Sequence, residues 1–230
     1  MKNMSIAGLA AATLLLQACS TVPTSNQTQV WSQTGKSVAI VVEPLPNTGA
    51  YKAGNQGLLD MAINSAVSGK LDGAVKAFKP TGFETLASEF EKNLVGRGLK
   101  AAIIQEDIEA LPKFTKPAGQ PRGVQSFKQN VAASAALNAH DYVLFIDTQQ
   151  VGTIRSYYSV VPTSPPSGHY LGKGYLIDTK TNEIKWTQTI TTNQAAVGKW
   201  DVPPNYTAVI QAIQGAVNQA KAVYQADLFQ

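Results

Sequence analysis

The chain has 230 residues, of which 15% are charged, with a formal net charge of +4 at pH 7 and a single cysteine. So small a net charge gives no reason to expect a nucleic-acid partner, and one cysteine excludes a disulfide within the chain. The length fits one domain of ordinary size, whose surface must be supplied largely by uncharged polar residues.

The N-terminal stretch carries the most specific signal in the sequence. Lys2 is followed by an apolar run from Met4 to Leu16, which is shorter than the roughly 20 residues that a membrane-spanning helix needs. The layout is that of a secretory signal, and residues 16–19, Leu-Gln-Ala-Cys, resemble the lipobox of bacterial lipoproteins. That resemblance implies removal of residues 1–18 and attachment of lipid to Cys19. An ordinary cleaved signal followed by a chance cysteine is the alternative.

Lipidation of Cys19 would determine where the chain works and what chemistry it retains. It would use the only thiol, which excludes a cysteine nucleophile and a thiolate metal site. The lipoprotein class carries several acyl chains, and several chains hold a protein stably at a membrane where one is marginal. Ser20 stands where an aspartate would indicate retention at the inner membrane. The resemblance therefore implies the outer membrane, on its periplasmic face.

Two further segments are expected after the signal peptide. Residues 19–35 should form the lipid anchor and a polar tether, because residues 20–34 are uncharged and lack periodicity. Trp31 is the exception and should either dock on the domain or lie at the lipid interface. Residues 36–230 should form a single α/β periplasmic domain.

The first half of that domain is expected to contain a strand, helices and a second strand. The continuous β-branched run Ser37–Val42 predicts a buried strand. Residues 58–67 can form a helix, and residues 69–81 predict a softer link containing glycine and proline. Residues 100–105 predict the second strand.

The clearest helix of the sequence lies just before that second strand. Thr81 and Glu84 fit a capping box at its start, and Gly96 and Gly98 are expected to end it. Its apolar side chains recur at three- and four-residue steps on one face. These are Phe83, Leu86, Ala87, Phe90 and Leu94.

The middle of the chain predicts a loop, a helix and a central strand. Residues 112–123 form a proline-rich loop, and residues 124–139 predict a helix. Residues 141–147 predict a third strand at the centre of the sheet, because they contain a fully apolar run. The inward residues of the predicted helix are Val124, Phe127, Val131 and Ala135.

The remaining segment predicts a β-meander and a C-terminal helix. Residues 149–161 continue with alternation to a turn-rich tip at residues 162–169. Two strands follow, at 170–177 and 183–189, joined by a turn-forming stretch. A final helix after Pro203-Pro204 has Tyr206, Ile210, Ile213, Val217 and Tyr224 on one face. The fold class is therefore α/β, a mixed β-sheet with helices packed on it and a helix at the C-terminus.

Residues that could carry chemistry are few and scattered. Gly35-Lys36-Ser37 precedes a strand instead of following one, so it is not a phosphate-binding loop, and Gly172-Lys173-Gly174 indicates a bulge or a close backbone approach. His140 is expected at a boundary between helix and strand. Asp141, Asp147, Asp178 and Glu183 could be imagined as acid–base pairs, but strand-ending aspartates are typical of turns. We expect no catalytic, cofactor-binding or metal-binding residue, and hence no enzyme.

A loop-rich projection between residues 155 and 170 combines aromatic side chains with one cation. Tyrosine and arginine are enriched at the energetic centres of protein–protein interfaces. The segment therefore predicts a surface that binds an envelope partner, while a hairpin whose tyrosines pack on its own sheet is the alternative. The predicted contact residues are Arg155, Tyr157, Tyr158, His169 and Tyr170, of which His169 is by default an exposed loop residue.

Three sequence segments together resemble a known domain family. They read GLKAAI at 98–103, AHDYVLFI at 139–146 and GYLIDTKTNEIKW at 174–186. This order is similar to the periplasmic domain of outer-membrane lipoproteins such as the penicillin-binding-protein activator LpoB and the curli secretion protein CsgG, which share the fold of the TolB N-terminal domain. The resemblance implies a TolB N-terminal-like domain in a non-catalytic adaptor or assembly factor that binds another envelope protein.

Two other functions are weighed against the adaptor. One is a subunit of an oligomeric secretion or surface-structure assembly, so the sequence leaves a homo-oligomer open. The other is an enzyme acting on peptidoglycan. The membrane, through lipid on Cys19, and an envelope protein are the predicted partners, and no cofactor is expected.

Overall fold

The structure is a computed structural model that describes residues 30–54, 69–119 and 123–228. Its centre is a seven-stranded mixed sheet in the order β3-β1-β4-β6-β7, with β2 and β5 each paired to β4. Pairing is parallel for β1 with β3 and for β4 with β1 and β2, and antiparallel for β4 with β5 and β6 and for β6 with β7. The predicted mixed α/β sheet is thus confirmed. The strands are β1 (Ser37–Val42), β2 (Gly49–Ala53), β3 (Lys100–Ile103), β4 (Tyr142–Tyr158), β5 (Val161–Pro162), β6 (Ser167–Asp178) and β7 (Ile184–Ala195).

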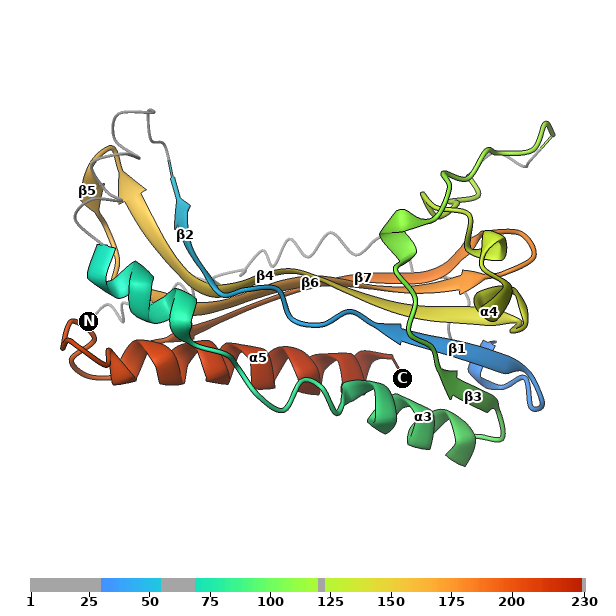
Figure 1. The fold of residues 1–230 in the computed structure, drawn as a ribbon, viewed down its shortest axis with the longest axis horizontal. Coiled ribbons are helices and arrows are strands. Elements are labelled where there is room, and N and C mark those ends of the chain that lie inside the picture. Colours follow the sequence, from blue (N-terminus) through green and yellow to red (C-terminus); the bar gives the residue numbers. More distant parts are fainter. Residues whose placement is uncertain (1–29, 55–68, 120–122, 229–230) are drawn as a thin grey trace, which may run out of the picture.

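Helices cover the two faces of the sheet unequally. The long helices α3 (Leu86–Gly96) and α5 (Thr207–Asp227) lie on one face, below the sheet in Figure 1. On the other face the described residues form only short elements. Two lie toward the end where β1 begins, η2 (Val131–Ala133) and α4 (Ala135–Asn138), and η1 (Ile108–Ala110) lies nearer the end of β1, close to Glu43. The larger core cluster fills the α3 and α5 side, and a smaller one lies under the short elements.

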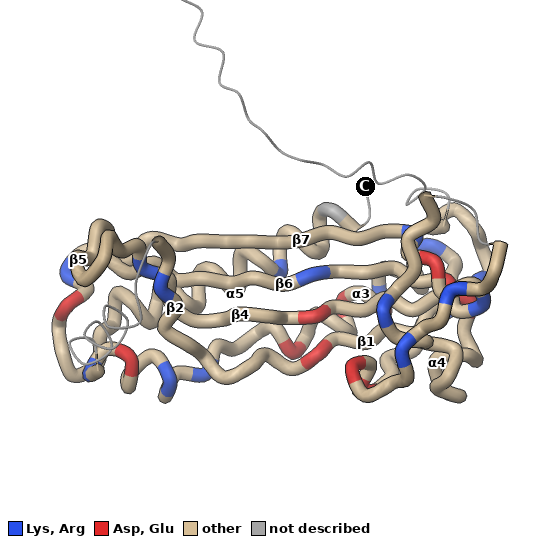
Figure 2. Tube along the Cα trace, turned by 90° about the horizontal axis from the view of Figure 1, so that it is seen from above, with Lys and Arg blue, Asp and Glu red and all other residues tan. Residues whose placement is uncertain are grey.

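The central strand β4 is longer than predicted. The expected strand at 141–147 is confirmed as the sheet's centre, and it continues through the segment expected separately at 149–161. An irregularity between Thr148 and Gln150 shifts the register with β6 without ending the pairing. Figure 2 shows β4, β6 and β7 running side by side along the long axis of the molecule.

Glycines of β6 let the C-terminal helix approach the sheet. A Cβ atom on Gly168 would lie 1.9 Å from the backbone oxygen of Ala212 in α5, and one on Gly172 would lie 2.5 Å from the Tyr170 hydroxyl. A Cβ on Gly174 would lie 2.5 Å from the Trp186 ring. A Cβ on Gly172 would also lie 2.8 Å from the Asp147 backbone oxygen, which confirms a close backbone approach at that residue, whereas Gly174 makes room for a side chain of β7. Burial of Ile213, Val217 and Tyr224 likewise confirms most of the predicted apolar face of α5.

The helix predicted over residues 124–139 is wrong for most of its length. Phe127 and Val131 are buried as expected, whereas Ala135 is exposed. The segment is held extended because the amide of Phe127 donates to the Asn182 carbonyl, while the Asn182 side-chain amide donates to the carbonyls of Phe127 and Gln129. Tertiary hydrogen bonds and the packing of Phe127 between Phe145 and Tyr175 replace the helical ones.

The helix before β3 is confirmed, but its predicted capping box is wrong. Leu86, Phe90 and Leu94 are buried and the helix ends at Gly96. It begins later than expected, with Thr85 as the N-cap, and the Thr81 amide instead donates to Gln214 Oε1 of α5. The link expected at residues 69–81 is helical over 69–77, and the helix expected at 58–67 lies outside the described residues.

Candidate functional site

The chain enters the domain at the end of the sheet where β1 and β4 begin. Cys19 lies outside the described residues, which start at Val30. Val30 and Trp31 are 4% and 5% exposed and belong to the larger core, and the Tyr142 hydroxyl donates to Gln33 Oε1 over 3.3 Å. Trp31 therefore docks on the domain, and Val30 packs in the core beside it.

Hydrogen bonds to Asp141 hold the start of β1 against the start of β4. Its carboxylate accepts hydrogen bonds of 2.9 Å from the Ser37 amide, the Ser37 hydroxyl and the Lys36 ammonium. These bonds, led by the Ser37 amide, lower the pKa of Asp141 to about 2. The neighbouring His140 is a boundary residue as predicted, and its carbonyl accepts from the Thr179 hydroxyl. The role of Asp141 is structural.

The predicted contact residues of the 155–170 segment are not all at the surface. Tyr170 is fully buried between sheet and α5, where its hydroxyl lies 3.0 Å from Thr148 Oγ1. His169 is 3% exposed, and its ring nitrogens lie 2.8 Å from Asn193 Oδ1 and 3.1 Å from Gln150 Oε1. The expectation that these two side chains face a partner, and that His169 is an exposed loop residue, is wrong because β6 extends back to Ser167 and places both in the sheet.

Arg155 and Tyr157 brace the outer end of the same segment. Arg155 Nε donates to the Ser164 carbonyl over 2.7 Å, and its guanidinium carbon lies 4.8 Å from the centre of the Trp200 ring. Tyr157 is 7% exposed and pairs with Pro162 across the hairpin formed by β4 and β5. Both residues are therefore engaged in contacts within the chain.

The tip of this hairpin presents apolar side chains to solvent. Tyr158 is 75% exposed and its cross-strand partner Val161 is 57% exposed, with Val160 between them also exposed. Val197 and Val202, in the loop that precedes α5, are exposed as well, and Trp200 of that loop contacts Arg155. Both segments lie at the same end of the molecule in Figure 1. We call Tyr158, Val160 and Val161 the apolar tip.

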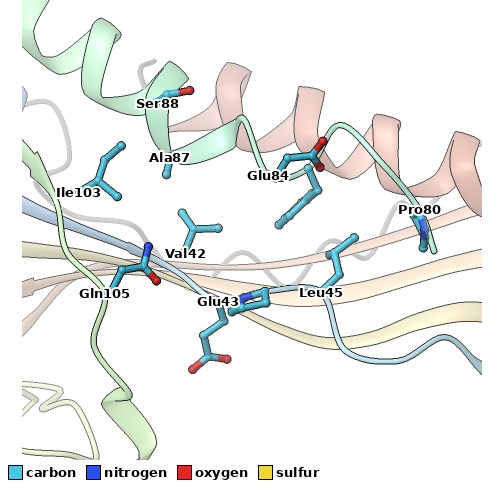
Figure 3. Close-up of a pocket in the computed structure, with 11 residues that line it drawn as sticks. Val42, Glu43, Leu45, Pro80, Glu84, Ala87, Ser88, Ile103 and Gln105 are labelled. Carbon is cyan, nitrogen blue, oxygen red and sulfur yellow. The ribbon is translucent and has the colours of Figure 1, made fainter.

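A separate pocket of about 390 Å³ opens between α3 and the ends of β1 and β3. Figure 3 shows Val42, Ala87 and Ile103 turned toward its interior, with Glu84, Ser88 and Gln105 around it. The pocket lies at the carboxyl ends of two parallel strands, where α/β sheets commonly bind ligands. Its lining can accept an apolar group. The remaining lining residues are Glu43, Pro44, Leu45, Pro80 and Phe83.

Among the described carboxyl groups, Glu43 has the environment most unfavourable to charge. Its side chain leaves β1 on the side opposite Val42, as Figure 3 shows. Burial raises the pKa of Glu43 to about 7, and the nearby negative charges of Asp147, Glu109 and Asp107 act in the same direction. Asp147, one of the four acids that the sequence suggested as possible acid–base residues, thus lies close to another acid, Glu43. Asp178 caps its own turn, accepting from the Lys180 and Thr181 amides, and Glu183 pairs with Lys185.

Sequence reasoning missed both the pocket and Glu43. The pocket joins residues that are far apart in the chain, so no local pattern marks it. The sequence did hold one weak signal for Glu43. This acid directly follows a buried strand and precedes Pro44, so its carboxyl group must lie at the end of that strand. Among the described residues no cluster of three or more His, Cys, Asp or Glu side chains could hold a metal ion, and no helix is long and apolar enough to cross a membrane.

Comparisons with known proteins give structural likenesses only. No protein-family model matches the chain, and no curated protein matches its sequence. The chain is similar to protein XCC0632 from Xanthomonas campestris, of the DUF330 family model, at 12% identity and a TM-score of 0.40, over 86% of this chain and 87% of that one. It is similar to lipoprotein GNA1162 from Neisseria meningitidis at 15% identity and a TM-score of 0.28, over 80% and 96% of the two chains.

A third likeness is to a dodecamer of a PelC variant from Paraburkholderia phytofirmans, at 11% identity and a TM-score of 0.26, over 81% of this chain and 89% of that one. At such TM-scores these proteins assign neither a function nor an assembly state to the chain. The resemblance to the TolB N-terminal domain has no counterpart among the three and stays a prediction.

Proposed function

We propose that the chain is an outer-membrane lipoprotein, anchored through Cys19 and facing the periplasm, that acts as a non-catalytic adaptor or assembly factor for another envelope protein. The lipobox-like residues 16–19 support the anchor. The observation that carries the adaptor function is the apolar tip, where Tyr158 and Val161 stand exposed on a hairpin braced from within. Clustered exposed apolar residues on a folded domain are typical of interaction sites.

The bracing of the tip makes it suited to binding. Arg155 contacts both the loop that follows β5, through the Ser164 carbonyl, and the loop before α5, through Trp200. The amide of Thr163 also donates to the Ser156 carbonyl over 2.9 Å. A surface that is already ordered loses less conformational entropy when a partner binds. The exposed tyrosine is also of the type that dominates binding energy at interface centres.

The position of the tip relative to the tether fits an anchored adaptor. The chain enters the domain beside Tyr142, at the start of β4, and the tip lies at the end of the same 17-residue strand. At about 3.3 Å per residue, β4 separates the two points by roughly 50 Å. Figure 1 places them at opposite ends of the molecule. A tether to the membrane at one end would leave the tip free to reach a partner.

The proposal is tested by crosslinking and pull-down from intact envelopes with a variant that changes only the tip. Tyr158→Ala combined with Val161→Ser should lose the partner that the wild type captures and keep its thermal midpoint, because both side chains are exposed. Val95→Ser is the matched control, since Val95 is also exposed but lies on α3. Tyr157 is left unchanged because it is buried.

Two results would contradict the proposal. In one, the tip variant retains the same partners as the wild type, so the tip does not bind them. In the other, capture is lost but the thermal midpoint falls together with it, so the loss reports unfolding instead of a contact. Loss of capture in the Val95→Ser control would count against the tip in the same way.

A further inference from the structure

The outer edge of β7 is the longest open strand edge that the structure describes. β7 has 12 residues and pairs on one side with β6. At its start, the amide of Ile184 donates to the Gln125 carbonyl, so residues 125–126 cover that end. From Thr189 to Ala195, no described strand pairs with the outer side. Every second residue there directs its backbone N–H and C=O groups outward.

This edge lacks the features by which proteins prevent strand edges from pairing. Edge strands are usually kept short or carry lysine, proline or a bulge. Residues 186–198 contain no charged residue and no proline, and the register of β6 with β7 is regular from Leu176 to Ser167. The opposite edge behaves as expected, because β3 has only 4 residues and begins with Lys100. The open edge of β7 is also rich in threonine, which favours strands.

We propose that residues 189–195 of β7 pair antiparallel with the same residues of a second copy of this chain, so that two sheets join into one across a two-fold axis. A two-fold axis perpendicular to the sheet pairs a strand with itself in antiparallel orientation. Because the edge carries no charge, no like charges meet across that axis. The pairing is independent of the lipid and of the apolar tip, so it stands or falls separately from the proposed function.

The helix beneath β7 is compatible with such an interface. A Cβ on Gly215 would lie 3.0 Å from the Gln194 side chain, so this flank of α5 faces the outer part of β7. Ala208 and Ala222 lie two turns to either side of Gly215 on the same flank. The pairing would bring the two α5 helices side by side, and small uncharged residues at their contact allow a close approach. A second copy would therefore both pair with the open edge of β7 and pack against this flank of α5.

The first test is the mass in solution of residues 19–230 with Cys19→Ser, which retain every described residue. Light scattering should give twice the monomer mass. Thr189→Lys combined with Thr191→Lys places exposed charges on facing strands, and should raise the dissociation constant of the dimer at least about tenfold, since like charges at an interface are costly. Val95→Lys on α3 should leave it unchanged.

The second test locates the axis by disulfide crosslinking. Single cysteines are introduced at Thr189, Thr191 or Ala195, which are exposed and on one face of β7. Because residues 189–195 pair with the same residues, the axis passes at Thr192, which is buried. Thr191 is the nearest of the three positions and lies diagonally opposite its own copy at about 7–8 Å, so Thr191→Cys should crosslink and the two more distant positions should not. A monomer at all concentrations, or equal crosslinking at every position including a Val95→Cys control, would overturn the proposal. If the protein is a monomer, the open edge of β7 would instead pair with the tether or with a strand of another protein.

Discussion

Glu43 follows β1 directly and meets the negative charges of Asp147, Glu109 and Asp107 in a half-buried position. Its pKa is raised from 4.5 to about 7, first by burial and then by those charges. Below about pH 7 the folded chain therefore favours the protonated carboxyl of Glu43. The free energy of unfolding contributed by this group is highest below pH 4.5 and decreases as the pH rises through about 7, because the folded state binds the proton that the unfolded state has already lost.

Glu43→Gln should remove this pH dependence. The variant is expected to be more stable than the wild type at about pH 8, where the wild-type carboxylate is charged, and to differ little at about pH 4. Denaturant unfolding at both pH values measures the difference. Asp147→Asn is the companion variant, since removing that charge should move the wild-type decline to lower pH. An equal effect of Glu43→Gln at both pH values would contradict the assignment.

Gly168 is the residue at which any side chain is least tolerated by α5. Gly168→Ala should lower the free energy of unfolding by about 3 kcal/mol or more, because the added Cβ meets the Ala212 backbone oxygen, which cannot move without displacing the helix. Chemical denaturation gives the value. Gly73→Ala is the matched control in the helical segment 69–77, where nothing lies within 4 Å, and it should stabilise by about 0.5–1 kcal/mol. Similar effects at the two positions would show that close packing is not the cause.

Among the elements, the segment at residues 124–131 depends on one side chain outside it. Asn182 is 1% exposed; its amide donates to the carbonyls of Phe127 and Gln129, and its oxygen accepts from the Val131 amide over 3.1 Å. Asn182 also adopts a φ of 57°, which suits asparagine better than most residues. Asn182, in the turn between β6 and β7, thus holds in place the segment that covers the second face of the sheet.

Asn182→Ala should therefore cost about 3 kcal/mol, since it leaves buried backbone groups without partners. Hydrogen exchange should show the amides of residues 127–131 losing protection before those of β4. Thr181→Ala, at an exposed position in the same turn, should change stability by less than about 0.5 kcal/mol. If the two substitutions had equal effects, the turn as a whole, and not the Asn182 side chain, would hold the segment.

The comparison of α3 with residues 124–139 shows which elements a sequence can predict. In α3 the spacing of Leu86, Phe90 and Leu94 agrees with the contacts that the helix makes, so periodicity was sufficient. Residues 124–139 have a similar spacing, but hydrogen bonds from Asn182 keep the segment extended. A partner more than fifty positions away cannot be read from a local pattern. The same reason hides the pocket beside Glu43, whose walls come from separate parts of the chain.

The predicted partner surface likewise could not be located from local sequence patterns alone. Composition drew attention to residues 155–170 as a surface for a partner, and Tyr158 is exposed there. Alternation could not tell where β6 begins, so His169 was expected in the exposed tip, although it lies within the sheet. Tyr170 was expected to begin a strand and to face a partner, but its side chain is buried. The side chains that face solvent are instead Tyr158, Val160 and Val161, two of which are aliphatic.

Seen as a whole, the molecule is a long sheet with the chain's entry at one end and the apolar tip at the other. In the proposed function this arrangement matters only if the chain is held at a membrane through Cys19. An anchored domain would present the tip roughly 50 Å from the tether, at 3.3 Å per residue of β4. Without the lipid, the separation of the two ends would have no functional consequence. The anchor is therefore the central claim.

The intact mass of the full-length protein, expressed in a bacterium and purified from its membranes, tests this claim most directly. The account predicts a chain that begins at Cys19, has lost residues 1–18 and carries the added mass of acyl groups on that residue. Cys19→Ala should remain unprocessed and lack the added mass. A wild-type chain that begins elsewhere, or that begins at Cys19 with a free thiol, would contradict the lipid anchor and the adaptor function that rests on it.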